Sequence, residues 1–417
     1  MCAVENVEGL VSGPDEHPLR SALFVTGLWG RDGGVAAHVK ESAAALAGQG
    51  VDVHVLAAKI ATDDRAGGVT VHHRPELLNT RARVEQRLGD ICALDPEIAH
   101  IHQVDDHAIV ARLRAATPVV ISAHGFPGCT SGVYYFAPGQ ECARAHGPGC
   151  IPNLALRGCA HTRYPRTLPA KYMGVTRGLA MFREADLAVC YSSAVARHLA
   201  TNGLAHTAVI PYFPTMTPRV GSGYETRRRV VFAGRLVLPK GVDVLIRAVA
   251  RVDADLVICG EGRREPKLRA LARRVGIEER VRFKGWMGPE QLAQELADAS
   301  VLAVPSLWPE PFGIVGIEAF SAGRPAVGSA TGGIPDWLKD GVCGVAVAPG
   351  DVDALALALG RLLDDPQLQQ TMGLAGRDLV AERFSAQRHV DTLLVAYRRA
   401  RGRWQERSGR AQAPQAA

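Results

Sequence analysis

The chain has 417 residues, which is too long for one ordinary hydrophobic core, so two domains are expected. Hydrophobic residues make up 47% and charged residues 22%, a composition typical of globular proteins. The formal net charge of +6 is spread along the chain apart from its Arg-rich ends. It weakly favours small anionic ligands and gives no support to nucleic-acid binding.

The two ends and the cysteine count bear on the compartment. Residues 1–20 contain no apolar run of signal-peptide length, and no uncharged window is long enough to cross a membrane. Nine cysteines, an odd number, fit reduced thiols better than a complete set of disulfides. We therefore expect a cytoplasmic protein, with disordered segments at residues 1–20 and 406–417.

The first half, residues 21–213, alternates predicted strands and helices. A buried strand at residues 22–26, a glycine-rich turn, a helix at 35–46 and a strand at 51–57 form the start of a doubly wound parallel sheet. Further strands are predicted at residues 69–72, 98–101, 119–121, 187–191 and 208–211, and further helices near residues 81–94, 108–115, 176–184 and 194–199. Ser192 and Ser193 are predicted to cap the last of these helices.

The pattern breaks at residues 212–226, the predicted linker, and restarts in a second domain, residues 214–385. Its strands are predicted at residues 230–232, 254–259, 281–283, 301–305, 325–329 and 344–347, and its helices at residues 242–249, 265–275, 290–297 and 314–323 and from residues 352 and 366 onward. A last helix, residues 386–405, is long enough to return to the first domain. Two such α/β domains facing a cleft would bring the carboxyl ends of their strands to a shared ligand site.

The stretch WPEPFGIVGIEAFSAG (residues 308–323) has the densest set of candidate ligand groups. Glu310 stands between two prolines that stiffen its backbone, and Gly313 permits a turn before the helix. Glu318 lies within that helix, and Gly323 is placed to end it. Carboxylates accept hydrogen bonds from hydroxyl groups and a helix N-terminus attracts anions, so the stretch suits a ligand that is part sugar and part phosphate.

Cations and glycines at other strand ends could complete such a site. Arg235 and Lys240 follow the first strand of the second domain, where they could clamp a diphosphate or simply be solvated surface cations. Gly33 and Gly34 precede a helix N-terminus, where they could approach a phosphate or form an ordinary turn. His124 follows a strand of the first domain and could hydrogen-bond a sugar hydroxyl or polarise a leaving group.

Three other patterns could suggest further ligand or metal sites, which are disfavoured. The Gly260-Glu261-Gly262 turn lacks the third glycine of a dinucleotide fingerprint, which disfavours a nicotinamide site. The pairs Asp253/Asp255 and Asp351/Asp353 precede regular elements, where acidic caps are ordinary. The alternating histidines of HIHQVDDH, which include His100 and His102, are expected at a cleft rim rather than at a metal.

A segment at residues 126–170 has no clear helical or strand period and contains Cys129, Cys142, Cys150 and Cys159. Their spacing is wider than that of a CxxC knuckle, so a structural zinc and reduced thiols both stay open. A long insertion beside the cleft is expected to shape the pocket for a second substrate.

The motifs FAGRLVLPKG, ICGEG, VRFKGWM and PEPFGIVGIEAFSAGRPAVGSATGG together resemble the retaining glycosyltransferases of family 4, also called glycosyl transferases group 1. The first half matches more loosely, through DGGVAAHV, SAHGF and ADLAVCYSSAVARHLATNG. The resemblance implies the GT-B fold, in which two Rossmann-like domains face a cleft and the C-terminal helix packs on the N-terminal domain. One departure is that IPYFP replaces the family's common Asn-Gly before the linker.

The resemblance also implies residue roles. Arg235 and Lys240 would hold the donor's diphosphate, Glu318 the ribose hydroxyls, and Glu310 the transferred sugar. His124 would lie near the hydroxymethyl group of that sugar. The remaining implied donor contacts are Gly33 and Gly34 near the phosphate, Gly285, Trp286 and Met287 near the nucleobase, and the backbone N–H groups of Phe312, Gly313, Ile314 and Val315.

The implied activity is retaining and metal-independent transfer of a hexosyl or N-acetylhexosaminyl group from a nucleotide-diphosphate sugar, UDP-linked in the prediction, to a hydroxyl. No cofactor is required. The first domain lacks a strongly basic amphipathic helix, which favours a soluble acceptor over a lipid, as in secondary-metabolite or cell-envelope glycan synthesis. The alternatives are a sugar-nucleotide 2-epimerase, for which no additional acid/base set is found, and a non-catalytic sugar-nucleotide-binding protein. The sequence does not address the oligomeric state.

Overall fold

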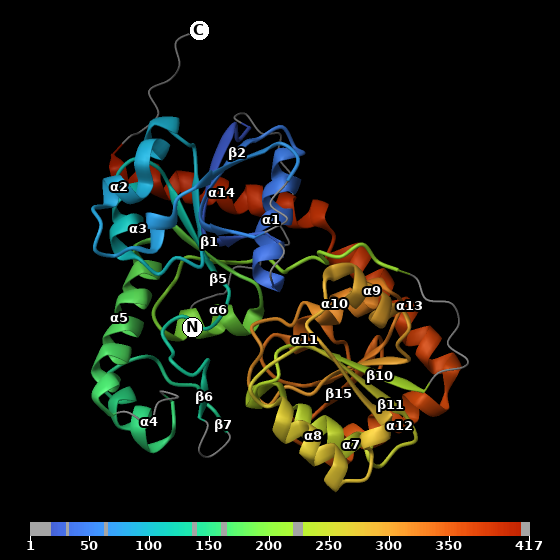
Figure 1. The fold of residues 1–417 in the computed structure, drawn as a ribbon. Coiled ribbons are helices and arrows are strands. Elements are labelled where there is room, and N and C mark those ends of the chain that lie inside the picture. Colours follow the sequence, from blue (N-terminus) through green and yellow to red (C-terminus); the bar gives the residue numbers. More distant parts are fainter. Residues whose placement is uncertain are drawn as a thin grey trace. The chain divides into compact units, whose positions relative to one another are not determined.

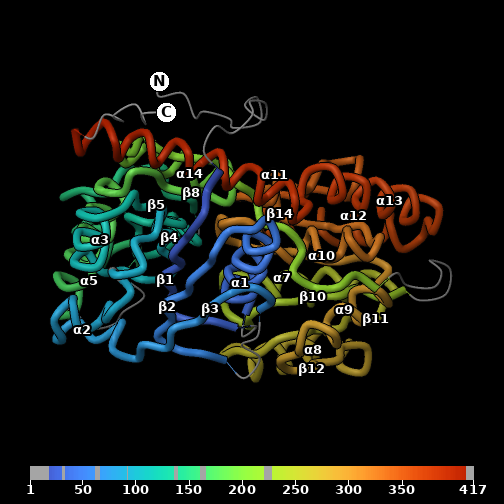
Figure 2. Tube along the Cα trace, turned by 90° about the horizontal axis from the view of Figure 1, so that it is seen from above, coloured from blue at the N-terminus to red at the C-terminus, as the bar shows by residue number. Residues whose placement is uncertain are grey.

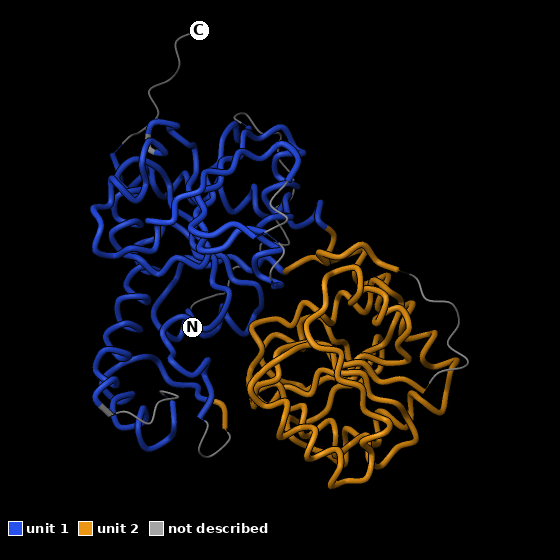
Figure 3. The backbone as a smooth tube through the Cα atoms, in the orientation of Figure 1, with its two compact units in different colours: residues 1–138, 142–211, 386–417 blue, residues 139–141, 212–385 orange. Residues whose placement is uncertain are grey.

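The computed structural model describes residues 18–30, 33–61, 66–135, 140–159, 165–219 and 228–409 (Figure 1). The chain divides into two compact units (Figure 3). Unit 1 comprises residues 1–138, 142–211 and 386–417, and unit 2 comprises residues 139–141 and 212–385. Each unit is built on its own parallel sheet, so the predicted α/β fold class is confirmed.

The sheet of unit 1 has seven parallel strands in the order β3-β2-β1-β4-β5-β8-β9. The strands are β1 (Ser21–Trp29), β2 (Asp52–Ile60), β3 (Val69–His73), β4 (Ala99–His102), β5 (Val119–Ala123), β8 (Leu187–Cys190) and β9 (Thr207–Val209). In the centre, Leu23 of β1 lies opposite Ala99 of β4, and both are buried. Helices cover both faces of such a sheet, which explains why its strands are runs of apolar residues rather than alternating ones.

Helices surround this sheet, and the last of them comes from the far end of the chain. They are α1 (Gly34–Ala47), α2 (Val84–Leu88), α3 (His107–Arg114), α4 (Cys150–Leu156), α5 (Leu168–Glu184), α6 (Ser193–Thr201) and α14 (Ala386–Ser408). Helix α14 packs against α1, β5 and β8 (Figures 1 and 2). Trp404 donates a hydrogen bond to the Arg114 carbonyl at 3.2 Å, and Arg407 pairs with Asp186 at 3.3 Å. The predicted return of the C-terminal helix to the first domain is confirmed.

The sheet of unit 2 has six parallel strands in the order β12-β11-β10-β13-β14-β15. The strands are β10 (Arg229–Ala233), β11 (Asp255–Cys259), β12 (Val281–Gly285), β13 (Val301–Val304), β14 (Ala326–Ser329) and β15 (Gly344–Val347). The helices are α7 (Val242–Val249), α8 (Glu265–Arg274), α9 (Pro289–Ala297), α10 (Val315–Ser321), α11 (Ile334–Trp337), α12 (Val352–Asp364) and α13 (Pro366–Arg383). Strands β10 and β13 are neighbours in the middle of this sheet, and the strands that follow each of them in the chain lie farther out on either side. The polar loops after β10 and β13 therefore emerge next to each other.

Some elements differ from the prediction. The single helix predicted at residues 81–94 is instead α2 followed by a 3-10 helix at Gly89–Leu94, because Gly89 adopts a φ of +59° that ends α2. Helix α5 begins at Leu168, before the predicted residue 176, and the short helix α11 was not predicted. The segment expected to lack regular structure contains α4 and the short strands β6 (Tyr134–Tyr135) and β7 (Gln140–Glu141).

The predicted disordered ends fall mostly outside the described residues, which begin at residue 18 and end at residue 409. Helix α14 continues to Ser408, three residues beyond its predicted end at residue 405. Within the described residues, no helix combines the length and the apolar character needed to cross a bilayer.

Candidate functional site

The centre of the candidate site in unit 2 is Glu310, which follows β13. Its carboxylate is 3% exposed and accepts hydrogen bonds from Lys240 Nζ at 2.8 and 3.0 Å, Ser306 Oγ at 2.5 Å and Trp308 Nε1 at 3.2 Å. Burial by itself raises the pKa of Glu310, but the charge of Lys240 and these donated hydrogen bonds outweigh it and lower the pKa below its usual 4.5. Glu310 is therefore an ionised carboxylate held in one orientation.

The pairing of Lys240 with Glu310 follows from the sheet. Strands β10 and β13 are neighbours, so the loops that follow them meet at one edge. Gly241 makes this possible: its φ is +66°, and a Cβ there would lie 1.9 Å from the carbonyl oxygen of Pro305. The loop after β10 is fastened to the loop after β13 by the hydrogen bond from the Leu307 N–H to the Pro239 carbonyl at 2.8 Å.

The backbone of Glu310 is held by the turn after β14. The Gly333 N–H donates to the Glu310 carbonyl at 2.7 Å. Gly332 has a φ of +61°, and a Cβ on it would lie 2.3 Å from that carbonyl oxygen. Only glycine fits a position with both a left-handed φ and this close backbone approach. The Thr331-Gly332-Gly333 turn therefore supports the loop that carries Glu310.

Trp337 of α11 fixes the turn before α10. Its indole N–H donates to the Phe312 carbonyl at 2.7 Å. Its six-membered ring lies so close to Gly316 that a Cβ there would be 2.3 Å from the ring. Gly313, with a φ of +90°, makes the bend between these contacts, as predicted from its position. Gly323 ends α10 with a φ of +71°, also as predicted.

Glu318 lies on α10 and has a different environment from Glu310. Burial raises the pKa of Glu318 to about 7, and one hydrogen bond from the Thr215 hydroxyl, at 3.4 Å, partly offsets this effect. Glu318 also lines a cavity of about 10 Å³ with residues 216–219 of the segment after β9. Its carboxyl group is thus partly protonated near neutral pH and can both donate and accept hydrogen bonds.

Arg235 and the turn after β11 lie in the same strand-end region of unit 2. The side chain of Arg235 is exposed, and within the described residues no ion pair engages it. Gly260 and Gly262 pack on the backbone of residues 234–236, where a Cβ on either would lie within 2.4 Å of a carbonyl oxygen. These two glycines therefore allow the loop after β11 to pack directly on the backbone of the loop after β10.

The residues predicted near a nucleobase lie at the end of β12, which Gly285 closes, and directly after it. Gly285 has a φ of +71°, and the carboxylate of Glu261 accepts a hydrogen bond from the Trp286 N–H at 3.1 Å. The indole of Trp286 is 59% exposed, and Met287 is half-buried. Because the hydrogen bond to Glu261 holds the backbone of Trp286, its exposed indole can offer a flat apolar face to a ligand ring.

In unit 1, the predicted ligand residues are at two strand ends. Gly33, with a φ of +105°, is the N-cap of α1, and Gly34 is its first residue; both are exposed. His124 follows β5 and is half-buried; its ring stacks on Tyr191 with centroids 4.8 Å apart, and its Nε2 lies 3.1 Å from His102 Nδ1. Burial lowers the pKa of His124 to about 3, so its imidazole is neutral.

His100 and His102 are not at a rim, because both side chains are 1% exposed in the core of unit 1. His100 bonds to Tyr397 of α14 at 2.7 Å and to Ser122 of β5 at 2.8 Å. The rim prediction was therefore wrong: alternation along β4 does not decide exposure when both faces of the sheet are covered. Among the described residues, no group of three or more His, Cys, Asp or Glu side chains is arranged to hold a metal ion.

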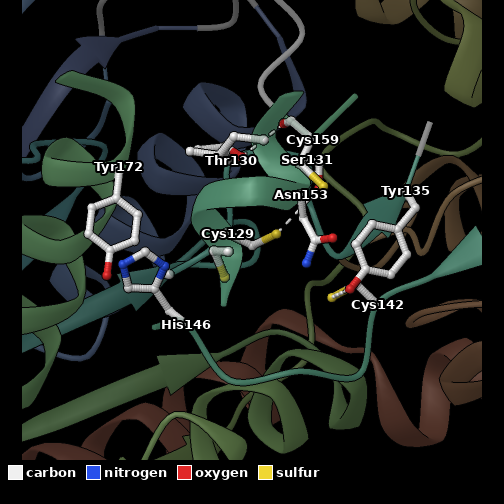
Figure 4. Close-up of a pocket in the computed structure, with 12 residues that line it drawn as sticks. Cys129, Thr130, Ser131, Tyr135, Cys142, His146, Asn153, Cys159 and Tyr172 are labelled. Atoms are coloured by element: carbon white, nitrogen blue, oxygen red, sulfur yellow. Dashed lines mark hydrogen bonds between the residues drawn. The ribbon is translucent and has the colours of Figure 1, made fainter. Parts of the chain in front are cut away.

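The four cysteines of the segment at residues 126–170 line one cavity of about 30 Å³ in unit 1 (Figure 4). Cys142 donates to the Tyr135 hydroxyl at 3.0 Å, and Cys129 accepts from the Val133 N–H at 3.2 Å. Burial, and then the neighbouring thiols, raise the pKa of Cys159 to about 11. The four cysteines that the sequence places in one segment thus line one cavity, together with His146 of the same segment and Tyr172 of α5.

Two of the predicted caps are seen directly. The Ser192 hydroxyl accepts from the Val195 N–H at 3.2 Å, and the Asp351 carboxylate accepts from the Ala354 N–H at 2.9 Å. No role was predicted for Ser306, Trp308 or Trp337. Ser306 and Trp308 lie within four residues of Glu310, which is the signal that could have found them, whereas no local pattern points to Trp337.

Two family models match the chain. The model described as Glycosyltransferase Family 4 matches residues 32–213, and the model described as Glycosyl transferases group 1 matches residues 218–379. Together they span most of the chain: the first match includes every strand of the unit 1 sheet except β1, and the second includes all the strands of the unit 2 sheet.

Among curated relatives, a D-inositol 3-phosphate glycosyltransferase of Actinosynnema mirum is 29% identical over 428 residues, which cover 90% of this chain and 94% of the relative. A D-inositol 3-phosphate glycosyltransferase of Streptomyces griseus is 43% identical over 159 residues, 35% of this chain. An alpha-D-kanosaminyltransferase of Streptomyces kanamyceticus is 32% identical over 42% of this chain. The chain spans only 34% and 47% of the lengths of these last two relatives.

Solved structures show the same fold. A sucrose-phosphate synthase from Thermosynechococcus elongatus superposes with a TM-score of 0.67 at 21% identity, covering 91% of this chain and 98% of that one. Anabaena HepE, in complex with UDP and glucose, superposes with a TM-score of 0.65 at 18% identity, covering 90% and 98%. With both family models and this fold in agreement, the chain belongs to the group 1, family 4 glycosyltransferases, which have the GT-B fold.

Proposed function

We propose that this protein is a retaining, metal-independent glycosyltransferase that moves a hexosyl or N-acetylhexosaminyl group from a nucleotide-diphosphate sugar to a hydroxyl of a soluble acceptor. The observation that carries the proposal is the buried, ionised Glu310 held by Lys240, with Arg235 in the same loop as Lys240. A fixed carboxylate beside two cations suits a ligand that has sugar hydroxyls at one end and a diphosphate at the other.

The chemistry follows from where charge develops. When the bond between the sugar and the diphosphate breaks, negative charge grows on the diphosphate and positive charge on the sugar ring. Arg235 and Lys240 stabilise the former, and the carboxylate of Glu310 the latter. Because fixed cations meet the departing diphosphate, the step needs no metal ion. Glu318, with its raised pKa, binds the ribose hydroxyls. No side chain acts as a nucleophile: the acceptor hydroxyl oxygen bonds to the sugar on the face that the diphosphate leaves, and its proton passes to the departing diphosphate.

The donor is proposed to be UDP-linked, with GDP as the nucleotide to test against it. HepE was solved with UDP and glucose, whereas a relative from Mycolicibacterium smegmatis, 39% identical over 39% of this chain, is a GDP-mannose-dependent mannosyltransferase. The exposed Trp286 can stack on either base, so the choice between them is not made by this face.

A donor and acceptor screen tests the proposal. Purified protein is mixed with UDP- and GDP-sugars and a panel of polyols, glycans and aglycones, and nucleotide release and product mass are measured. Transfer with the anomeric configuration of the donor, seen by NMR, supports the proposal. Epimerised sugar nucleotide without release would indicate an epimerase, and binding without turnover a sugar-nucleotide-binding protein.

The matched variants are Glu310→Gln and Glu279→Gln. Both remove one carboxylate charge from unit 2, but Glu279 is exposed on a 3-10 helix. We expect Glu310→Gln to lower kcat by at least about a hundredfold, as for the loss of one electrostatic stabiliser, and Glu279→Gln to leave it unchanged. A fully active Glu310→Gln would remove Glu310 from the site.

The cysteines are proposed to be reduced thiols in a cytoplasmic protein, with a structural zinc as the alternative. The separate hydrogen bonds of Cys129 and Cys142 support the thiols. Metal analysis separates the two, with Cys142→Ser as the control. One zinc per chain that is lost in Cys142→Ser would establish the zinc site.

A further inference from the structure

Cys129 and Cys159 lie far apart in the sequence but line the same cavity in unit 1 (Figure 4). The two residues that follow Cys129 connect it to Cys159. The Thr130 hydroxyl donates a hydrogen bond to the Cys159 carbonyl at 2.8 Å. The Ser131 hydroxyl lies 3.4 Å from Cys129 Sγ. The chain segments that carry the two thiols are therefore fastened to each other.

The same Ser131 hydroxyl also reaches the thiol of Cys159. Burial raises the pKa of Cys159 to about 11, the neighbouring thiols add to the rise with Cys129 first among them, and a hydrogen bond from Ser131 partly offsets it. Ser131 is itself buried. One buried hydroxyl group thus has both sulfur atoms around it.

The other two thiols of the cavity have different partners. Cys142 donates to the Tyr135 hydroxyl at 3.0 Å. Cys150 Sγ lies 4.0 Å from the carbonyl oxygen of Ala145. Because Ser131 contacts Cys129 and Cys159 and neither of these, the contacts single out one pair among the four thiols.

The two members of this pair differ in exposure. Cys129 is half-buried, whereas Cys159 is 7% exposed. A reagent from solution therefore meets Cys129 first. The thiolate is the reacting form of cysteine, and a thiol with a pKa of about 11 is almost entirely protonated near neutral pH. Cys159 is thus suited to react second, with a sulfur atom that is already held beside it.

We propose that Cys129 and Cys159 are a reversible redox pair, which forms a disulfide with peroxides. The Cys129 thiolate attacks one oxygen of hydrogen peroxide, the O–O bond breaks, and the products are a sulfenic acid and hydroxide, which takes up the proton that the Cys129 thiol has lost. The Cys159 sulfur then attacks the sulfenic sulfur, and the S–O bond breaks. Hydroxide leaves and combines with the Cys159 proton. Two thiols are oxidised to one disulfide, and one peroxide is reduced to two waters.

The disulfide would close residues 129–159 into a covalent loop that contains α4 and the strands β6 and β7. The proposal rests on the reduced state proposed above for the cysteines and not on glycosyl transfer. The simpler interpretation is that these cysteines only fill space as small apolar side chains. That interpretation predicts no disulfide between them in the folded protein.

Disulfide mapping distinguishes the two interpretations. The full chain is reduced, freed of reductant, treated while folded with hydrogen peroxide, alkylated and digested with trypsin. Cleavage after arginine places Cys129 in peptide 115–144 and Cys159 in peptide 158–163. We expect these two peptides to be joined, with a mass two hydrogen atoms below their sum, and to separate when dithiothreitol is added.

The matched variants are Cys129→Ser and Cys142→Ser, because both cysteines lie in the same tryptic peptide and line the same cavity. The joined peptides should be lost in Cys129→Ser and kept in Cys142→Ser. If Cys129→Ser does not fold, fragmentation of the joined wild-type peptides still shows which of the two cysteines carries the bond.

Three results would overturn the proposal. They are a bond to Cys159 through Cys142 or Cys150, no bond in the folded wild type, and one zinc per chain that is lost in Cys129→Ser. The mapping needs no turnover, so it decides the role of the thiols even if the screen for transfer fails.

Discussion

Lys240→Met should destabilise unit 2 more than Glu310→Gln, although each removes one partner of the same ion pair. The side chain of Glu310 is 4% exposed and that of Lys240 is 22% exposed. Without Lys240, the carboxylate stays buried with only the neutral donors Ser306 and Trp308. Without the carboxylate charge, the ammonium of Lys240 can turn towards water.

The expected sizes follow from this asymmetry. Removing one partner of a buried pair costs about 3–5 kcal/mol, and we expect about 3 kcal/mol for Lys240→Met because two donors remain. For Glu310→Gln we expect about 1 kcal/mol, the cost of one weakened hydrogen bond. The lowered pKa of Glu310 means that the pair stabilises the fold above pH 4.5 and stops doing so as pH falls below it. In Lys240→Met, burial is left to raise the pKa of Glu310, so the loss should be smaller at pH 5 than at pH 8.

Urea unfolding at both pH values measures these losses, and hydrogen exchange of peptides from residues 301–321 assigns them to unit 2. The exposed pair Arg273–Glu278 at 3.3 Å is the control: Arg273→Met and Glu278→Gln should each cost less than about 1 kcal/mol. Equal losses at Lys240 and Glu310, or a larger loss for Glu310→Gln, would contradict the argument from burial.

Four further outcomes are expected. Burial raises the pKa of Glu318 to about 7 from the usual 4.5, so the wild type loses stability as the pH rises between these values. Glu318→Gln should therefore be more stable than the wild type by up to about 3 kcal/mol at pH 8 and equally stable at pH 4. A stability difference that does not depend on pH would refute this. Trp337→Phe removes the donor to the Phe312 carbonyl and should cost about 1 kcal/mol and raise KM for the donor, and an unchanged KM would show that the turn is held by other contacts. Gly332→Ala places a methyl group against the backbone of Glu310, whereas the Cβ of Gly33→Ala would meet nothing within 4 Å. Gly332→Ala should therefore lower kcat more than Gly33→Ala. Equal losses of kcat would show that the positive φ shared by both positions, and not the contact with Glu310, causes the loss. Transfer should continue at the same rate in excess EDTA, and its loss with recovery on adding Mg²⁺ would overturn metal independence.

The parts of the fold that could be predicted were those with a strong local pattern. The apolar spacing of α7 gave its bounds, Val242–Val249, to the residue, and the same is true of β15, Gly344–Val347. The start of α5 was missed because Gly174 weakens the helical pattern before residue 176, and the helix depends on packing against α3 and α4. Gly89 was read as part of a helix because a left-handed φ leaves no mark on the apolar period.

Within the site, residue types and order were visible in the sequence, but pairings were not. Glu310 and Lys240 are 70 residues apart, and only the order β10-β13 in the sheet makes their loops neighbours. The bond between His102 and His124 depends in the same way on β4 and β5 being adjacent. Strand order is a property of the whole chain, so no local pattern could reveal either contact.

The ion pair between Lys240 and Glu310 also bears on how Lys240 and Arg235, the two residues predicted to bind the diphosphate, would act. Lys240 is already neutralised by Glu310 in the free protein, so in the proposed function a diphosphate gains its attraction by sharing Lys240 with a carboxylate. Arg235, exposed and without an ion pair among the described residues, is the cation whose full charge faces the solvent. In the proposed function, attraction of the donor would therefore fall mainly to Arg235. Lys240 would become most effective only when negative charge grows on the departing diphosphate, as a stabiliser of the transition state more than of the bound substrate.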